Sequence, residues 1–155
     1  MTDLTHLDAA GHARMVDVAA RDVTTRTATA SGRVTTAAAQ LIRSGAVPKG
    51  DVLGVARIAG IMATKRTPDL IPLCHPIAVH GVDVSVETSD DADEVRIVAT
   101  VRTADRTGVE MEALTAVAVA GLAVIDMVKA IDPHAALRDV QVEVKDGGRS
   151  GAWTR

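Results

Sequence analysis

Two neighbouring stretches of the chain alternate apolar and polar residues, which is the pattern of half-buried strands. GVDVSVET, residues 81–88, directs its valines to one face, and EVRIVATVR, residues 94–102, does the same with four apolar residues. The acidic SDDADE between them is a turn, so the two segments predict a hairpin. DVQVEVK, residues 139–145, repeats the alternation and predicts a last strand, with Val140, Val142 and Val144 directed inward.

Ahead of these strands, a Thr-rich segment, residues 21–34, predicts a first strand, and helical patterns separate the strands from one another. TTAAAQLIRSG predicts a short helix that stops at Gly45. PKGDVLGVARIAGIMATKR predicts a second helix, which Pro68 is expected to end. Its apolar residues at helical spacing are Val52, Val55, Ala59 and Met62. A third and longer helix runs from about Gly108 to Ile131, before Pro133.

The resulting order is strand, helices, strand, strand, helix, strand. This is the split βαβ order of an α+β, ferredoxin-like fold, with an antiparallel sheet and helices packed on one face. No internal repeat or linker is visible, so we expect residues 1–155 to form a single domain. Residues 1–20 would be an N-terminal arm, and residues 145–155 a Gly-rich basic tail.

Composition narrows the class of protein. The chain has one Trp and neither Phe nor Tyr, so its core must be built from small side chains and its elements must approach closely. We hypothesise that partner subunits complete the burial. A net charge of −3 and the scarcity of aromatic residues argue against a nucleic-acid surface.

The sequence also bears on location and redox chemistry. The longest apolar-rich run, ALTAVAVAGLAVI, is too short to span a bilayer, so no membrane is expected. The first residues do not resemble a signal peptide, and the one cysteine excludes an internal disulfide. We therefore expect a cytoplasmic protein.

The segment PDLIPLCHP, residues 68–76, is the first candidate for chemistry. Its prolines stiffen a loop that holds Cys74 and His75. A zinc site would need three or four ligands, and the remaining histidines have no ligand spacing, so no metal is expected. The alternatives are a cysteine that fills space in the interior and a histidine held rigidly as a binding group.

Charges on the long helix are the second candidate. Asp126 and Lys129 are three residues apart and share a face of a helix that is apolar on nearly every side, so we expect both to be buried. They are either a functional pair or an ion pair at a subunit contact. Glu110 and Glu112 begin the same helix, where acidic residues also favour the helix dipole.

Scattered basic residues are the third candidate. Together, in an acidic protein, they would suit a phosphorylated small molecule. GGRSG resembles a flexible anion-binding loop, although no Walker A sequence is present. These residues are Arg26, Lys49, Arg57, Lys65, Arg66 and Arg149.

Four segments carry a more specific signal: MVDV, KGDVLGVARIAGIMATKRTPDLIPLCHP, TGVEMEALTAVAVAGLAVIDMVKA and KDGGRSG. They resemble the cyclic pyranopterin monophosphate synthase family, called MoaC, of molybdenum cofactor biosynthesis. The similarity runs in register from LTH near the N-terminus to GGRSG, which is nearly the whole chain.

The resemblance implies a lyase with a ferredoxin-like fold. Members of the family convert 3',8-cyclo-7,8-dihydroguanosine 5'-triphosphate, supplied by a radical enzyme that acts on GTP, into cyclic pyranopterin monophosphate, and they release pyrophosphate. The resemblance also implies a hexamer, a trimer of dimers with sites at subunit interfaces, and no redox cofactor.

The same resemblance implies roles for individual residues. The catalytic acid–base position falls on Asp126, and the essential lysines fall on Lys49 and Lys129. At position 149 many relatives have Lys where this chain has Arg, which keeps the charge and argues against proton transfer there. The implied substrate contacts are Leu73, Cys74, His75, Glu110, Met111, Glu112, Lys65, Arg26 and Arg149.

One geometric point follows from the long helix. Glu112 and Asp126 are 14 residues apart, or about 21 Å along a continuous helix. They cannot meet at one reacting centre within a subunit, so we hypothesise a composite site at a two-fold contact. The rival interpretations are a nucleotide-binding regulatory module without turnover and a metal protein that binds through Cys74 and His75.

Overall fold

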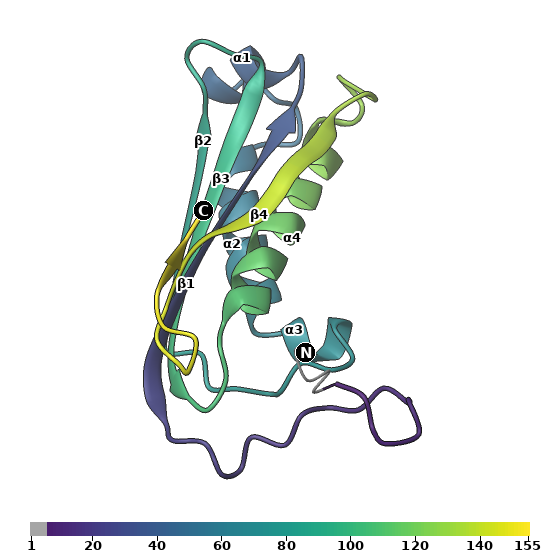
Figure 1. Cartoon of the computed structure of the whole chain (residues 1–155). Coiled ribbons are helices and arrows are strands. Elements are labelled where there is room, and N and C mark those ends of the chain that lie inside the picture. The colour runs from purple at the N-terminus through teal and green to yellow at the C-terminus, as the bar shows by residue number, and fades with distance from the viewer. Residues whose placement is uncertain (1–5) are drawn as a thin grey trace.

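The fold is built on one five-stranded sheet, seen in a computed structural model that describes residues 6–155 (Figure 1). The order across the sheet is β2-β3-β1-β4-β5, and each pair of neighbours is antiparallel. The predicted α+β class with an antiparallel sheet is confirmed, and the order is compatible with a ferredoxin-like fold. The strands are β1 (Thr24–Thr35), β2 (Gly81–Thr88), β3 (Glu94–Asp105), β4 (Ala136–Asp146) and β5 (Trp153–Thr154).

Two long helices cover one face of this sheet (Figure 1). The helices are α1 (Ala39–Arg43), α2 (Val52–Thr64), α3 (Thr67–Leu70) and α4 (Glu110–Val128). The side chain of Asp51 caps α2 by accepting the N–H of Gly54 at 2.9 Å. Pro68, expected to end α2, instead lies in the first turn of α3, a position where its missing N–H costs nothing.

The predicted second helix is present as α2, but its four apolar residues at helical spacing do not all face the core. Val55 and Met62 are 46% and 62% exposed, whereas the buried side of α2 consists of Val52 and smaller residues such as Gly60. A Cβ atom at Gly60 would lie only 3.0 Å from the carbonyl oxygen of Ala116 on α4. The small residues therefore set the helix contact, in line with the close approach that the composition predicted.

The expectation that α4 is buried on every side was also wrong. One face packs on α2 and the sheet, while Leu122 is 57% exposed and Asp126 faces solvent. By length and composition alone, α4 is apolar enough to cross a membrane, with a mean hydropathy of 1.9. Half of the apolar segment of α4 is nevertheless buried inside this fold, as expected for a core helix.

The last long strand, β4, is irregular, and this corrects one inward prediction. Ala30 of β1 pairs with Val142, but Thr29 pairs with Val144, so one extra residue is inserted between them. Val144 therefore lies opposite Thr29 on the outer face and is 40% exposed, contrary to prediction. Lys145 pairs with the buried Ala28 and turns toward the helices.

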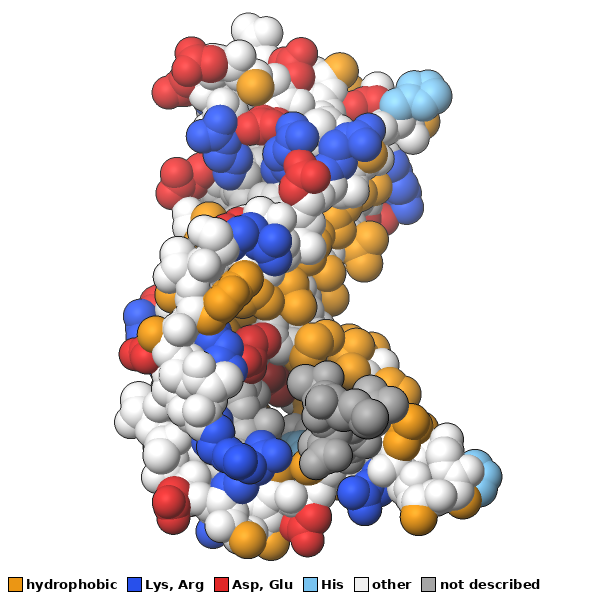
Figure 2. Space-filling model, in the orientation of Figure 1, with side chains coloured by type: hydrophobic (Ala, Val, Ile, Leu, Met, Phe, Trp, Pro, Cys, Tyr) orange, Lys and Arg blue, Asp and Glu red, His pale blue; other side chains and the backbone are white. Residues whose placement is uncertain are grey.

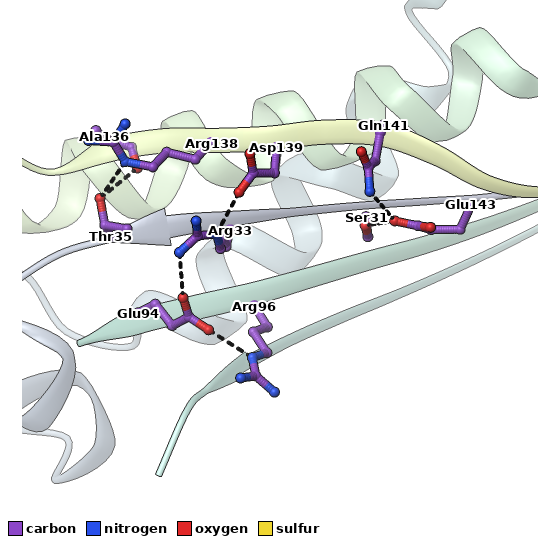
Figure 3. A network of polar contacts seen from close by, with 10 residues as sticks. All are labelled: Ser31, Arg33, Thr35, Glu94, Arg96, Ala136, Arg138, Asp139, Gln141 and Glu143. Atoms are coloured by element: carbon purple, nitrogen blue, oxygen red, sulfur yellow. Dashed lines mark hydrogen bonds and ion pairs between the residues drawn. The ribbon is translucent and has the colours of Figure 1, made fainter. Parts of the chain in front are cut away.

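The outer face of the sheet is polar, and Figure 3 shows its hydrogen-bond network. Arg33 lies between Glu94 at 3.0 Å and Asp139 at 2.7 Å, and Arg96 also contacts Glu94, at 2.9 Å. Asp139 is the only non-glycine residue among positions 6–155 with positive φ, at 53°, which marks a second irregularity of β4. The helix face therefore supplies the core, and the opposite face carries paired charges.

Candidate functional site

A cavity of about 950 Å³ lies at the end of the molecule where α4 begins. The start of β1, the end of β4, the loop after β3 and the N-terminal arm meet there, and Figure 2 shows Lys and Arg side chains beside the hollow. A smaller lobe of about 200 Å³ adjoins it. The two share four lining residues, and we call them the phosphate lobe and the small lobe; the shared residues are Arg21, Thr107, Gly108 and Glu110.

Arg26 is the most buried cation of the phosphate lobe. It is only 8% exposed, and its Nε donates to the carbonyl oxygen of Asp105 at 2.9 Å. Gly148 has a φ of 77°, which favours glycine, and a Cβ atom there would force the Arg26 guanidinium to move. Arg149 follows in the same loop and also lines the lobe. The glycines of the tail thus allow the backbone to close over a buried arginine.

Lys145 is a lining residue that the sequence reasoning missed. Its Nζ lies 3.1 Å from Oε1 of Glu110 and donates to Oγ of Ser150 at 2.7 Å. Simple alternation along β4 would send this residue outward, and the extra residue in the strand reverses it. The only available signal was its place at the head of KDGGRSG.

The small lobe gathers the predicted contacts of the stiff loop and the first turn of α4. Leu73, Cys74 and His75 line one wall, and Met111 and Glu112 line another. No regular strand or helix holds the loop between α3 and β2, and its prolines restrict it instead. The structure thus brings together five predicted residues from two distant segments.

Glu112 and Cys74 have altered acidities in this lobe. Glu112 is 3% exposed, and its burial, together with the nearby charge of Glu110, raises its pKa to about 7. Burial also raises the pKa of the Cys74 thiol, and the charge of Glu112 adds to that effect. Cys74 is therefore a protonated thiol at neutral pH, which argues against a nucleophile.

Three other predicted residues meet at the opposite end of α4. Lys129 Nζ lies 2.7 Å from Oδ1 of Asp126, and Lys49 Nζ lies 3.4 Å from Oδ2 and 2.6 Å from the backbone carbonyl oxygen. We call these residues the exposed trio. Hydrogen bonds from Lys129 and then Lys49 lower the pKa of Asp126. The expected burial was wrong, since the side chains of Asp126 and Lys129 are each 60% exposed.

The predicted site residues thus form two groups rather than one. α4 is unbroken between Glu112 and Asp126, so the about 21 Å separation stands. Lys65 belongs to neither group: it is an exposed residue at the end of α2 and lines neither lobe. Across residues 6–155, no three His, Cys, Asp or Glu side chains are arranged to hold a metal ion.

Comparison with known proteins identifies the family of this chain. The sequence model of the MoaC family matches residues 15–148. The chain belongs to the MoaC family.

Curated MoaC relatives cover nearly the whole chain. A protein of Streptomyces coelicolor is 65% identical over 98% of this chain and 89% of its own length. One from Nocardioides sp. is 62% identical over 98% and 95%, and one from Thermomicrobium roseum is 55% identical over 100% and 95%. Each of the three is named cyclic pyranopterin monophosphate synthase.

Proposed function

We propose that this chain catalyses the reaction for which its MoaC relatives are named. The substrate would be the cyclised dihydroguanosine triphosphate, and the products cyclic pyranopterin monophosphate and pyrophosphate. The observation that carries the proposal is identity above 60% over nearly the full length of two synthases. The enzyme would be a cytoplasmic lyase of molybdenum cofactor biosynthesis, supplied by a radical enzyme that cyclises GTP.

More cations than carboxylates line the phosphate lobe, and this excess of positive charge favours a triphosphate. Arg26 is held by Asp105 through Nε, so the two Nη groups remain for a ligand. Arg149 and Lys145 add two further cations, although Glu110 neutralises part of the lysine charge. A polyanion would compete with Glu110 for Lys145, and the triphosphate would bind along these three side chains.

The small lobe suits the pterin-forming part of the substrate. Leu73, Cys74 and Met111 form its apolar walls, and Glu112 offers a carboxyl group that is close to half protonated at neutral pH. Such a group can either accept or donate a hydrogen bond to the edge of a purine-derived ring. Lys65 remains a predicted contact from the resemblance alone.

The exposed trio would supply the proton transfers. Asp126 is ionised at neutral pH and can accept a proton, while the ammonium groups of Lys49 and Lys129 beside it can donate one. In the last step a ribose hydroxyl oxygen attacks the α-phosphorus. The bond from phosphorus to the bridging oxygen breaks, pyrophosphate leaves, and the hydroxyl proton passes to a base.

The cavity and the exposed trio lie at opposite ends of α4, so one subunit cannot bring them together and we expect an oligomeric enzyme. A two-fold contact would bring the exposed trio of one subunit to the cavity of its neighbour and create two equivalent sites. Exposed apolar side chains on the same helices favour such a contact, and hydrophobic residues gather on this flank in Figure 2. They are Val55, Ile58, Met62 and Leu122. The expected assembly is a hexamer, a trimer of dimers.

Pyrophosphate release from the cyclised dihydroguanosine triphosphate tests the proposal. Wild type should release pyrophosphate and form a cyclic phosphate, whereas Lys49→Ala and Asp126→Ala should not. Tight binding by wild type without release would instead assign the chain to a regulatory class.

Subunit mixing tests the composite site. Inactive Glu112→Ala and Asp126→Ala proteins, mixed after reversible dissociation, should regain part of the wild-type activity. Each mixed dimer would contain one intact site. Mixed assembly proven by mass spectrometry, without any recovered activity, would contradict the shared site.

A further inference from the structure

The N-terminal arm crosses the site as an irregular strap. Between the bridge that pairs Leu7 with Ala13 and the start of β1, residues 14–23 contain no helix or strand. Within this stretch, two side chains of the body hold the strap through its backbone. Nε2 of His75 lies 2.6 Å from the carbonyl oxygen of Val16, and Nε of Arg106 donates to the carbonyl oxygen of Arg21 at 3.0 Å.

Arg21 is the cation that this strap carries into the site. It lines both the phosphate lobe and the small lobe, and it is the only basic residue that does so among the residues the structure describes. Asp17, another residue of the strap that lines the phosphate lobe, accepts the backbone N–H of Ala19 at 2.8 Å. Asp22 and Glu110 also line the phosphate lobe, and Glu110 is paired with Lys145.

The contact of His75 limits what its ring can do for a ligand. A carbonyl oxygen only accepts, so Nε2 carries the hydrogen that is donated to Val16. In the neutral ring, Nδ1 is then an acceptor and cannot donate to a phosphate oxygen. This geometry favours a role for His75 through the strap over a direct phosphate contact.

We propose that Arg21 is a phosphate-binding residue at the junction of the two lobes and that His75 is a positioning residue that holds it there by anchoring the strap at Val16. The inference rests on the proposed function and deepens it, because it assigns part of the triphosphate binding to the arm. Loss of either residue then removes the same interaction.

Glutamine and asparagine replacements separate the two possible roles of His75. The side-chain N–H of Gln reaches the place of Nε2, whereas that of Asn reaches the place of Nδ1. His75→Gln should keep the strap seated and bind inorganic tripolyphosphate like wild type. His75→Asn should resemble His75→Ala, with affinity lowered roughly 10-fold, as expected for a lost charge-assisted contact. The opposite ranking would overturn the proposal and return His75 to a direct contact through Nδ1.

A double-mutant cycle in tripolyphosphate affinity provides the second test. Arg21→Ala should weaken binding by about as much as His75→Ala, and the double variant should be no weaker than either, because both act through one interaction. Additive losses would overturn the proposal. Arg106→Ala, which releases the second anchor, should behave like His75→Ala.

Amide hydrogen exchange supplies a readout without any ligand. Residues 14–22 should exchange faster in His75→Ala and His75→Asn than in wild type and His75→Gln. Unchanged exchange of these residues in His75→Ala would contradict the proposal that His75 anchors the strap. Because exchange and tripolyphosphate binding do not depend on turnover, failure of the strap proposal and failure of the proposed lyase activity give different results.

Discussion

The two ends of α4 hold carboxylates in opposite physical settings. At its start, Glu112 is 3% exposed, and its pKa is raised to about 7. At its end, Asp126 is 60% exposed between two lysines, and its pKa is lowered. The first end is enclosed by segments of one chain, while the second has cations in place but no enclosing wall. A single helix therefore carries one enclosed group of charged residues at its start and one solvent-exposed group at its end.

The sharpest test of this contrast is Asp126→Asn. We expect a loss of activity of roughly 10²- to 10⁴-fold, typical of a group that transfers protons. The thermal midpoint should stay close to that of wild type, because the carboxylate is exposed and such pairs add little stability. Asp83→Asn is the matched control: Asp83 is an exposed partner of Arg102 at 2.6 Å, and its loss should leave activity unchanged. A large loss of stability in Asp126→Asn would show that the exposed end is structural.

At the enclosed end, Arg26→Lys should raise KM by roughly 10- to 100-fold with a smaller change in kcat. Lysine keeps the charge but loses the fork of donors that is anchored through Asp105. Steady-state kinetics at saturating and limiting substrate measure the split. Arg96→Lys, on the outer face, is the control and should change neither constant. A fall in kcat alone would place Arg26 in the chemical step instead.

The buried carboxyl of Glu112 should make stability depend on pH. Below about pH 4.5, the ordinary pKa of a glutamate, Glu112 is protonated in the folded and the unfolded chain and does not lower stability. As pH rises toward 7, the unfolded chain releases this proton and the folded one retains it, so stability falls, by roughly 3 kcal/mol at most. Glu112→Gln should lack this part of the decline when unfolding by urea is measured at pH 5 and pH 8. The exposed Glu87→Gln should decline like wild type, and an equal slope in Glu112→Gln would contradict the raised pKa.

The smallest expected effect belongs to Cys74. Cys74→Ser should retain activity within a few-fold of wild type, because the thiol is protonated at neutral pH and forms part of a wall. Thiol alkylation should accordingly be slow. A complete loss of activity in Cys74→Ser with the fold intact would require a chemical role for the sulfur.

The hydrophobic pattern along the chain predicted the helices and strands well, but it predicted less well which of their side chains point to the core. The strand over residues 81–88 has the predicted bounds, because strict alternation and a tight turn determine it. The prediction that Val144 of β4 faces inward was wrong, because one inserted residue changes the alternation and no sequence pattern marks the insertion. The spacing along α2 could not show which apolar residues are buried: Val55 and Met62 are exposed, because smaller residues such as Gly60 make the close contact with α4.

The site shows the same limit. The family resemblance implied that Leu73, Cys74 and His75 share a site with Met111 and Glu112, and the structure brings these residues together in the small lobe. Arg21 lies in an arm without periodicity and Lys145 lies in an irregular strand, so neither could be assigned a side from the sequence alone. The burial of Asp126 was inferred from the apolar character of α4, which could not reveal that one side of the helix lacks a partner within the chain.

The absence of Phe and Tyr has an optical consequence. Trp153 is the only aromatic side chain, so ultraviolet emission from this protein originates outside its core. Trp153 is 44% exposed in β5 and pairs in register with Lys145, and the centre of its ring lies 5.4 Å from the Arg155 guanidinium. Its emission therefore records how the C-terminal segment is seated beside the phosphate lobe. An unmodified sample thus carries a built-in spectroscopic probe of the C-terminal segment, whereas unfolding of the interior must be followed through the backbone.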